Sequence, residues 1–345
     1  MFIRSTNKLL KLHEPVTGKE EADAVKRVFD SGWLAEGKET ARFERTVAEY
    51  VGARHAVAVS NCTVALELSL RAKQIKGEVV VPAFGHPATV RAIINAGCEP
   101  VFVDVDLEDY TVRVDYCPEN TKAVIPVSWG GNPIWSIPYD PIIIEDAACS
   151  LGASAYGEHV IEYAATTCYS FHPRKLITTG EGGMITTNNK ELSEKLRSLK
   201  NFGLGNYKID DVRAAIGTAQ MHRLEGIIQE RIRKARVYNE LLADVPNIKS
   251  PQSHELARHT YQTYAIFLQT GDRDKIITRL KQRGIETQIG AYALHRLPSF
   301  RHFGRIGKLE NSDLLAENLL ALPMSHSMTD EDQKYVVNCL EQLIP

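Results

Sequence analysis

Two ionisable side chains follow apolar, strand-like runs in this sequence and could act together on one bound molecule. The run PIIIE leads directly into Asp146, and the run TTCYSF is followed, after a short turn, by Lys175. An amine in a cleft attacks aldehydes, and a carboxylate keeps a pyridine-type ring protonated so that the ring withdraws electrons. Each residue alone has a plainer explanation, because Asp146 could cap the next helix and Lys175 could be a surface lysine.

The pKa of Lys175 decides how readily its amine reacts with a carbonyl. Burial in a desolvated cleft beside other cations lowers the pKa of a lysine and favours its neutral, nucleophilic form. Arg174 is the adjacent cation in the sequence, and a bound cofactor would contribute to the same environment. Such an environment would lower the pKa of Lys175.

A third feature is the run Ser60-Asn61-Cys62-Thr63, which joins an expected strand to an expected helix. Backbone amides at a helix N-terminus, together with the Thr63 hydroxyl, form an anion-binding site. The alternative is that Ser60 or Thr63 only caps the helix, as happens at many helices that bind nothing.

Short runs rich in β-branched residues predict the strands that position these groups. The expected strands are 55–60, 78–84, 100–106, 122–128, 141–146, 166–171 and 183–188. Their apolar character, and the helical patterns between them such as 63–73 and 87–97, are typical of a largely parallel sheet covered by helices on both sides. Binding sites in such sheets lie at the carboxyl ends of the strands, where Asp146 and Ser170 fall.

The two ends of the chain lack the regular alternation of strands and helices that is predicted for its middle. Residues 17–29 predict an amphipathic helix with a Thr17–Glu20 capping box and an end at Gly32. A long helical stretch at 213–243 precedes a remainder of mixed helical and strand-like runs. We expect an α/β protein with a large domain at 1–235 and a smaller α+β domain at 236–345.

Composition and charge exclude several classes of function. The chain of 345 residues has 41 Lys+Arg and 43 Asp+Glu, and this near balance gives no electrostatic footprint for nucleic acid or an anionic membrane. Neither a signal-peptide pattern nor an apolar run of bilayer length occurs. The six cysteines form no CxxC pair and the histidines show no metal-ligand spacing, so we expect free thiols, no metal and a cytoplasmic protein.

The segment Gly32–Glu39 nearly spells the phosphate loop of nucleotide hydrolases. Its last position should be Ser or Thr to hold magnesium, but it is Glu39. The segment also follows a helical pattern and not an apolar strand. We therefore reject nucleotide hydrolysis.

Segments distributed along the whole chain resemble one family. The motifs SNCTVALEL, EDAA and SFHPRK contain the three features above, and SGWLAEG, VPAFGHPATVRAIINAGCEPVFVDVD, GNYKIDDVRAAIGTAQMHRLE and LPMSHSMTDEDQKYVV match further segments in order. On these motifs the chain is similar to the DegT family of fold-type I, pyridoxal phosphate-dependent sugar aminotransferases. The resemblance implies a fold-type I aminotransferase-like fold and pyridoxal 5'-phosphate as the cofactor.

The resemblance also implies roles for individual residues. Lys175 would carry the cofactor as a Schiff base and move the substrate proton, and Asp146 would pair with the pyridine nitrogen. Thr63, the backbone at Cys62, and Ser170 would bind the phosphate. Asn206 would contact the phosphate of the other subunit, since family members are dimers with shared active sites, and His86 would stack on the cofactor ring.

Several positions depart from the family pattern. Cys62 stands where glycine is common, His86 where an aromatic ring is usual, and Cys149 where Gln or His often approaches the cofactor. Other departures are Phe202 for His, Lys208 for Arg, and Glu162-Tyr163 for Gly-Asp. Tyr292 and His295 fall near a family segment that approaches the substrate. These changes concern substrate choice and cofactor affinity more than the type of reaction.

The resemblance implies transfer of an amino group from an amino acid, with glutamate as the expected donor, to a keto-sugar, expected to be nucleotide-linked, in amino-sugar or polysaccharide biosynthesis. Two alternatives stay open. Some relatives are sugar dehydratases in which His replaces the cofactor-binding lysine, and Lys175 favours transamination over that reaction. A family member that binds the cofactor and serves as a regulator is the other alternative.

Overall fold

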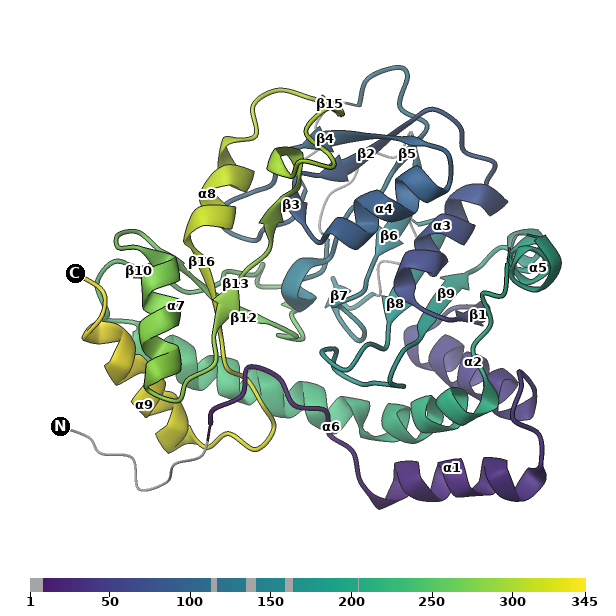
Figure 1. Ribbon diagram of the computed structural model, residues 1–345, viewed down its shortest axis with the longest axis horizontal. Coiled ribbons are helices and arrows are strands. Elements are labelled where there is room, and N and C mark those ends of the chain that lie inside the picture. Colours follow the sequence, from purple (N-terminus) through teal and green to yellow (C-terminus); the bar gives the residue numbers. More distant parts are fainter. Residues whose placement is uncertain (1–8, 113–116, 135–140, 159–163, 204) are drawn as a thin grey trace.

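The computed structural model describes residues 9–112, 117–134, 141–158, 164–203 and 205–345. Within this part of the chain the architecture is α/β, with one large mixed sheet and a smaller antiparallel sheet (Figure 1). The α/β architecture and the smaller C-terminal sheet agree with the predicted fold class.

The large sheet has eight strands in the described residues, and most neighbouring strands run parallel. In spatial order they are β1 (His55–Val59), β9 (Gly183–Thr187), β8 (Thr166–Ser170), β6 (Ile142–Asp146), β5 (Ala123–Val124), β2 (Glu78–Pro82), β4 (Glu99–Val103) and β15 (Gly304–Arg305). The strand expected at 122–128 is much shorter than predicted. Only β9 is antiparallel to both of its neighbours, β1 and β8. Consequently β1, β6 and β8 point the same way, and their carboxyl ends share one edge of the sheet.

Helices cover both faces of this sheet because its strands are apolar on both faces. The helices that pack on it include α2 (Lys38–Val51), α3 (Cys62–Ala72), α4 (Pro87–Asn95), α5 (Lys190–Ser198) and α6 (Asp211–Leu242). The other helices of the described residues are α1 (Lys19–Ser31), which packs on α6, and α7 (Arg273–Gln282), α8 (Glu310–Asn318) and α9 (Asp330–Glu341), which lie in the C-terminal region. Within β1, Val57 and Val59 join the core cluster that contains α3, whereas Ala56 and Ala58 join the cluster that contains α2 and α6. This division explains why the strand shows no apolar–polar alternation.

The C-terminal region forms an antiparallel sheet beside the large one. Its strands, in order, are β10 (Ile248–Lys249), β12 (Tyr264–Leu268), β16 (Leu319–Leu322) and β13 (Gln288–Ile289). Two-stranded pairings join β3 (Phe84–Gly85) to β14 (Tyr292–Ala293) and β7 (Ser154–Ala155) to β11 (Ala257–Arg258). Figure 1 shows α6 running beneath both regions, and α6 contacts α1 and α2 as well as α9. The predicted domain boundary at 235/236 falls inside α6, so that division stays a prediction.

The first helix begins later than the sequence predicts. The expected capping box between Thr17 and Glu20 is wrong, because Gly18 is the N-cap and its N–H donates to Oε2 of Glu21 at 2.6 Å. The predicted end at Gly32 is confirmed, since Gly32 has φ of 73°. No helix in the described part of the chain is long and apolar enough to cross a membrane.

A buried acid next to Asp146 contributes to the pH dependence of stability. Glu145 points to the other face of β6, accepts hydrogen bonds from Ser128 Oγ (2.6 Å) and Thr167 Oγ1 (3.3 Å), and is 3% exposed. Burial raises its pKa from 4.5 to about 7. Because the pKa is higher in the folded chain than in the unfolded chain, its contribution to stability is fully present below about pH 4.5 and is lost as the pH rises through about 7.

We therefore expect Glu145→Gln to reduce the pH dependence of unfolding between pH 5 and pH 8. Between pH 5 and pH 8, the free energy of unfolding of the variant should rise by about 3 kcal/mol relative to that of the parent chain. This value is the upper limit that the shift in pKa allows. Urea unfolding at both pH values measures this. The matched control is Glu99→Gln at an exposed position, and an unchanged pH dependence in Glu145→Gln would contradict the prediction.

Candidate active site

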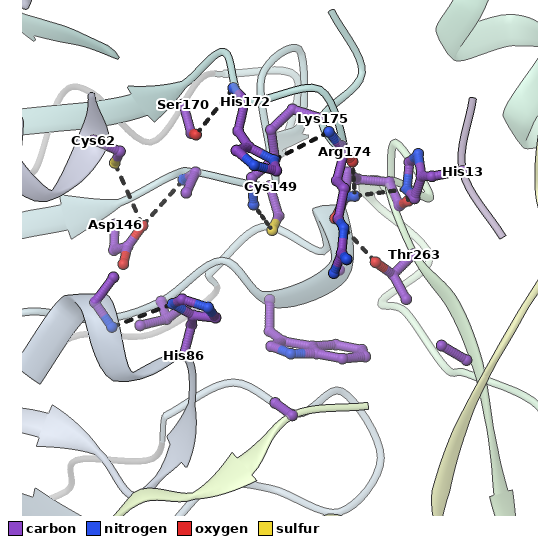
Figure 2. A pocket seen from close by; sticks show the side chains of 18 of the residues that line it. His13, Cys62, His86, Asp146, Cys149, Ser170, His172, Arg174, Lys175 and Thr263 are labelled. Carbon is purple, nitrogen blue, oxygen red and sulfur yellow. Dashed lines mark hydrogen bonds between the residues drawn. The ribbon is translucent and has the colours of Figure 1, made fainter. Parts of the chain in front are cut away.

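A cavity of about 500 Å³ opens at the shared carboxyl edge of the strands, between the two sheets. It is lined by all the predicted site residues except Asn206: Cys62, Thr63, His86, Asp146, Cys149, Ser170 and Lys175. Figure 2 shows Asp146 and Cys62 on one side of Lys175, and Arg174 and His13 on the other. The fold therefore brings together groups that lie far apart in the sequence.

Asp146 ends β6 and is held in place by two donors. Thr89 Oγ1 donates to Oδ2 at 2.7 Å, and the N–H of Ala148 donates to Oδ1 at 3.1 Å. The carboxylate is 5% exposed, and the Cys62 thiol lies 4.0 Å from Oδ1. A buried carboxylate with two hydrogen bonds and an open side toward the cavity suits the pairing with a cationic ring atom.

Lys175 follows the turn after β8, and its amine contacts a thiol. Its Nζ lies 3.0 Å from Sγ of Cys149 (Figure 2). Burial lowers the pKa of Lys175, but the sulfur of Cys149 and the carboxylate of Asp146 outweigh this and raise the pKa above its ordinary value. Cys149 and Asp146, and not Arg174, are therefore the groups that raise the pKa of Lys175 in the chain itself, and a lowered pKa in the presence of the cofactor stays a prediction.

The N-terminus of α3 provides hydrogen-bond donors to the cavity. Asn61 is the N-cap, and its side chain accepts the N–H of Val64 at 3.0 Å. The two preceding N–H groups, on Cys62 and Thr63, have no acceptor within the helix. In the described part of the chain, the Thr63 hydroxyl has no hydrogen-bond partner and faces the same cavity as Ser170.

Close packing fixes this loop against the sheet. A side chain at Gly183, where β9 begins, would overlap the backbone of Asn61. Glycine is thus required by the close approach of β9 to the loop before α3. The N-terminus of α3 is held rigidly at the sheet edge, as an anion-binding site requires.

His86 caps α4, and its ring faces the cavity. Its Nδ1 accepts the N–H of Ala88 at 3.2 Å, so the neutral ring carries its proton on Nε2. Burial and the nearby charge of Lys175 lower the pKa of His86. The imidazole therefore behaves as a neutral ring near pH 7. In this form it carries no charge, like the aromatic side chain that is usual at this position.

The two unusual cysteines have different environments. Cys62 is buried, and burial followed by the charge of Asp146 raises its pKa well above the ordinary value, so it stays a neutral thiol. Cys149 is only partly buried and contacts Lys175. All six cysteines are free, as expected.

Several of the other residues that the sequence analysis named do not line the cavity. Asn206 is exposed and does not line the cavity of its own chain. Tyr292 lines the cavity, whereas His295 does not and lies 3.0 Å from Asp313. Glu162-Tyr163 and the side chain of Phe202 lie outside what the structure describes, and Lys208 is exposed.

Residues that sequence reasoning missed complete the site. Thr89 holds Asp146, and Gln262 Nε2 donates to the carbonyl oxygen of Arg174 at 2.8 Å. Arg231, in the middle of α6, donates to three backbone carbonyls and also lines the cavity. No local pattern marks these residues, because each acts through a contact with a distant segment.

The segment that imitates a phosphate loop is structurally different from one. Gly32 ends α1 and Gly37 caps α2, so the segment joins two helices. The Asp211 carboxylate accepts the N–H groups of Gly37 at 2.8 Å and Thr40 at 2.9 Å. A carboxylate thus takes the position that a phosphate would need at this helix end.

A sequence model of one family covers nearly the whole chain. The DegT/DnrJ/EryC1/StrS aminotransferase family model matches residues 15–341. The chain belongs to this family. Members are pyridoxal phosphate-dependent sugar aminotransferases, in agreement with the predicted family and enzyme class. The spore coat polysaccharide biosynthesis protein SpsC of Bacillus subtilis is 30% identical to it over 99% of both chains.

Solved structures of sugar aminotransferases share the family fold. DesI, crystallised in the presence of its TDP-sugar product, has a TM-score of 0.91 and 26% identity, covering 98% of this chain and 93% of that one. A putative sugar aminotransferase from Streptococcus pneumoniae in its PLP form has a TM-score of 0.88 and 23% identity, covering 97% of this chain and 98% of that one. The same protein has also been solved in its PMP form.

Proposed function

We propose that the cavity binds pyridoxal 5'-phosphate and that the chain transfers an amino group from an amino acid to a keto-sugar. The observation that supports this most strongly is the placement of Lys175, Asp146 and the N-terminus of α3 around one cavity. The donor set fits the cofactor. The N–H groups of Cys62 and Thr63, with the hydroxyls of Thr63 and Ser170, suit a phosphate, and the Asp146 carboxylate suits a protonated ring nitrogen.

The bound cofactor supplies an aldehyde that takes up the amino group and a ring that accepts the charge left when the α-proton leaves. Lys175 would hold the cofactor through Nζ, and its free amine would move the α-proton. Asp146 would keep the ring nitrogen protonated, with Thr89 holding the carboxylate in position. His86 offers a neutral ring face for stacking, and Cys149 lies beside Nζ of Lys175.

The similarity to sugar-processing proteins supports a keto-sugar as the amino acceptor. SpsC is named for polysaccharide biosynthesis, and DesI was crystallised with a TDP-linked sugar. We infer that this chain uses a nucleotide-linked keto-sugar with glutamate as the donor, in amino-sugar or polysaccharide biosynthesis. Lysine at position 175, where dehydratase relatives carry histidine, favours amino transfer over loss of water.

The experiment that tests this proposal is a screen of nucleotide-linked keto-sugars with glutamate and the purified, cofactor-saturated protein. We expect an aminated sugar and 2-oxoglutarate in equal amounts, detected by mass spectrometry. A dehydrated sugar without nitrogen would support the dehydratase alternative, and cofactor binding without turnover of any sugar would support a regulator.

We further propose that two copies of the chain share their active sites. Asn206 is exposed and does not line the cavity of its own chain, which fits the family-derived role of contacting the cofactor phosphate of a second copy. We expect light scattering to give a dimer. Asn206→Ala should weaken cofactor binding by about 10-fold, the loss of one hydrogen bond to a charged group. A fully active monomer would contradict this proposal.

A further inference from the structure

Arg174 is a cation at the cavity whose backbone is fixed while its side chain stays available. Its N–H donates to Nδ1 of His172 at 3.2 Å, and its carbonyl oxygen accepts from Gln262 Nε2 at 2.8 Å. These bonds hold the main chain on both sides of the residue. The side chain is exposed and lines the cavity.

The guanidinium of Arg174 lacks an acidic partner in the described part of the chain. Among the described residues, its guanidinium donates one hydrogen bond, from Nη1 to the neutral amide oxygen Oε1 of Gln288 at 3.4 Å. Some other exposed arginines of the described residues are paired, such as Arg233 with Asp330 at 2.8 Å. Gln288 belongs to β13, so Arg174 reaches from the large sheet toward the C-terminal sheet.

Arg231 adds positive charge near Arg174, and no acidic side chain of the described residues forms an ion pair with Arg174. Arg231 lines the same cavity, is buried, and is bonded only to carbonyl oxygens of Tyr261, Gln262 and Met324. His13 is neutral near pH 7, because burial and then the charge of Arg231 lower its pKa to about 3. The two carboxylates that line the cavity have other partners. Asp146 accepts a hydrogen bond from Thr89, and Oε1 of Glu181 lies 3.9 Å from Nε2 of His172.

The part of the cavity lined by Arg174 and Arg231 therefore attracts a small anion that lies beyond the reacting nitrogen of Lys175. Figure 2 shows Arg174 on the side of Lys175 away from Asp146, so a group there belongs to the substrate and not to the cofactor ring. The planar guanidinium suits a carboxylate, which it binds through two parallel hydrogen bonds. Phosphate has the same charge preference, and the nucleotide-linked sugar is a second possible source of such an anion.

We propose that Arg174 binds the side-chain carboxylate of the amino donor and thereby selects an amino dicarboxylic acid. The inference rests on the proposed amino transfer at Lys175. Arg174 is exposed at the cavity, whereas Lys175 is half-buried, so the two side chains can contact opposite ends of one donor molecule. Glutamate and glutamine, which differ only in that end group, are the discriminating pair.

The binding test uses glutarate, a dicarboxylic acid that lacks the amino group, titrated calorimetrically into the cofactor-saturated protein. We expect Arg174→Gln to weaken glutarate binding by about 10- to 100-fold, as for a lost charge-assisted hydrogen bond, and Arg174→Lys to weaken it less. The matched control is Arg301→Gln, an exposed arginine outside the cavity lining, which should bind like the parent. Equal affinity in Arg174→Gln and Arg301→Gln, or no binding by the parent, would overturn the proposal.

The kinetic test separates this inference from the proposed function. Arg174→Gln should raise KM for glutamate by about 10- to 100-fold and leave KM for glutamine and for the sugar unchanged. Equal increases for both donors would assign Arg174 to the α-carboxylate, and an increase for the sugar alone would assign it to phosphate; either overturns the proposal. Absence of turnover with every donor would instead contradict amino transfer, while the glutarate titration would still test Arg174.

Discussion

Replacing Lys175 by Ala is expected to reduce amino transfer by about 10⁴-fold or more, because the variant loses both the cofactor-holding amine and the proton-transfer group. The cavity of about 500 Å³ leaves room for a small amine in place of the missing side chain. Added methylamine should therefore restore part of the activity of Lys175→Ala. Steady-state rates with and without methylamine measure both effects.

A second measurement identifies the lysine directly. Borohydride reduction of the parent protein followed by peptide mass spectrometry should place the cofactor on Lys175. The matched control is Lys249→Ala, an exposed lysine on β10, which should keep full activity and the same labelled peptide. Label on another lysine, or full activity of Lys175→Ala, would rule out the assignment.

Replacing Asp146 by Asn is expected to lower kcat by about 10²- to 10³-fold, with little change in KM for the amino donor. The substitution keeps the shape of the side chain but removes the negative charge that would face the cofactor ring, and loss of one such preorganised group has this magnitude. The pH dependence of the cofactor absorbance should also change, because the ring nitrogen would lose its counter-charge.

Thr89 provides the matched comparison for Asp146. Thr89→Val keeps the size of the side chain and removes its hydrogen bond to Oδ2, so we expect a loss of about 10-fold, the value of one hydrogen bond to a charged group. The ordering of the two variants is the informative outcome. If Thr89→Val lowers activity more than Asp146→Asn does, the charge of the Asp146 carboxylate is not its main contribution to kcat.

The sequence predicts the elements of this site better than the contacts between them. Asp146 and Ser170 were expected at strand ends, and both lie there, because apolar runs of β-branched residues mark buried strands. The antiparallel direction of β9 was not predicted, since strand pairing depends on distant partners and not on local pattern. The length of β5 was overestimated for the same reason.

The raised pKa of Lys175 shows the limit of sequence reasoning for electrostatics. Arg174 is adjacent in sequence, but the amine of Lys175 lies against Cys149. Neighbours in space set the pKa, and residue 149 belongs to another segment. The holding contacts of Thr89 and Gln262 are equally long-range, so no spacing in the chain reveals them.

The long helix α6 has a consequence for how the chain unfolds. Leu224 and Ile228 of α6 belong to the core beneath the large sheet, whereas Tyr238 and Leu242 belong to the core of the C-terminal region. Both cores therefore use faces of one continuous helix of 32 residues. Melting of either core exposes part of α6 and weakens its packing on the other, so local loss of order in one region is transmitted to the other as a loss of stability.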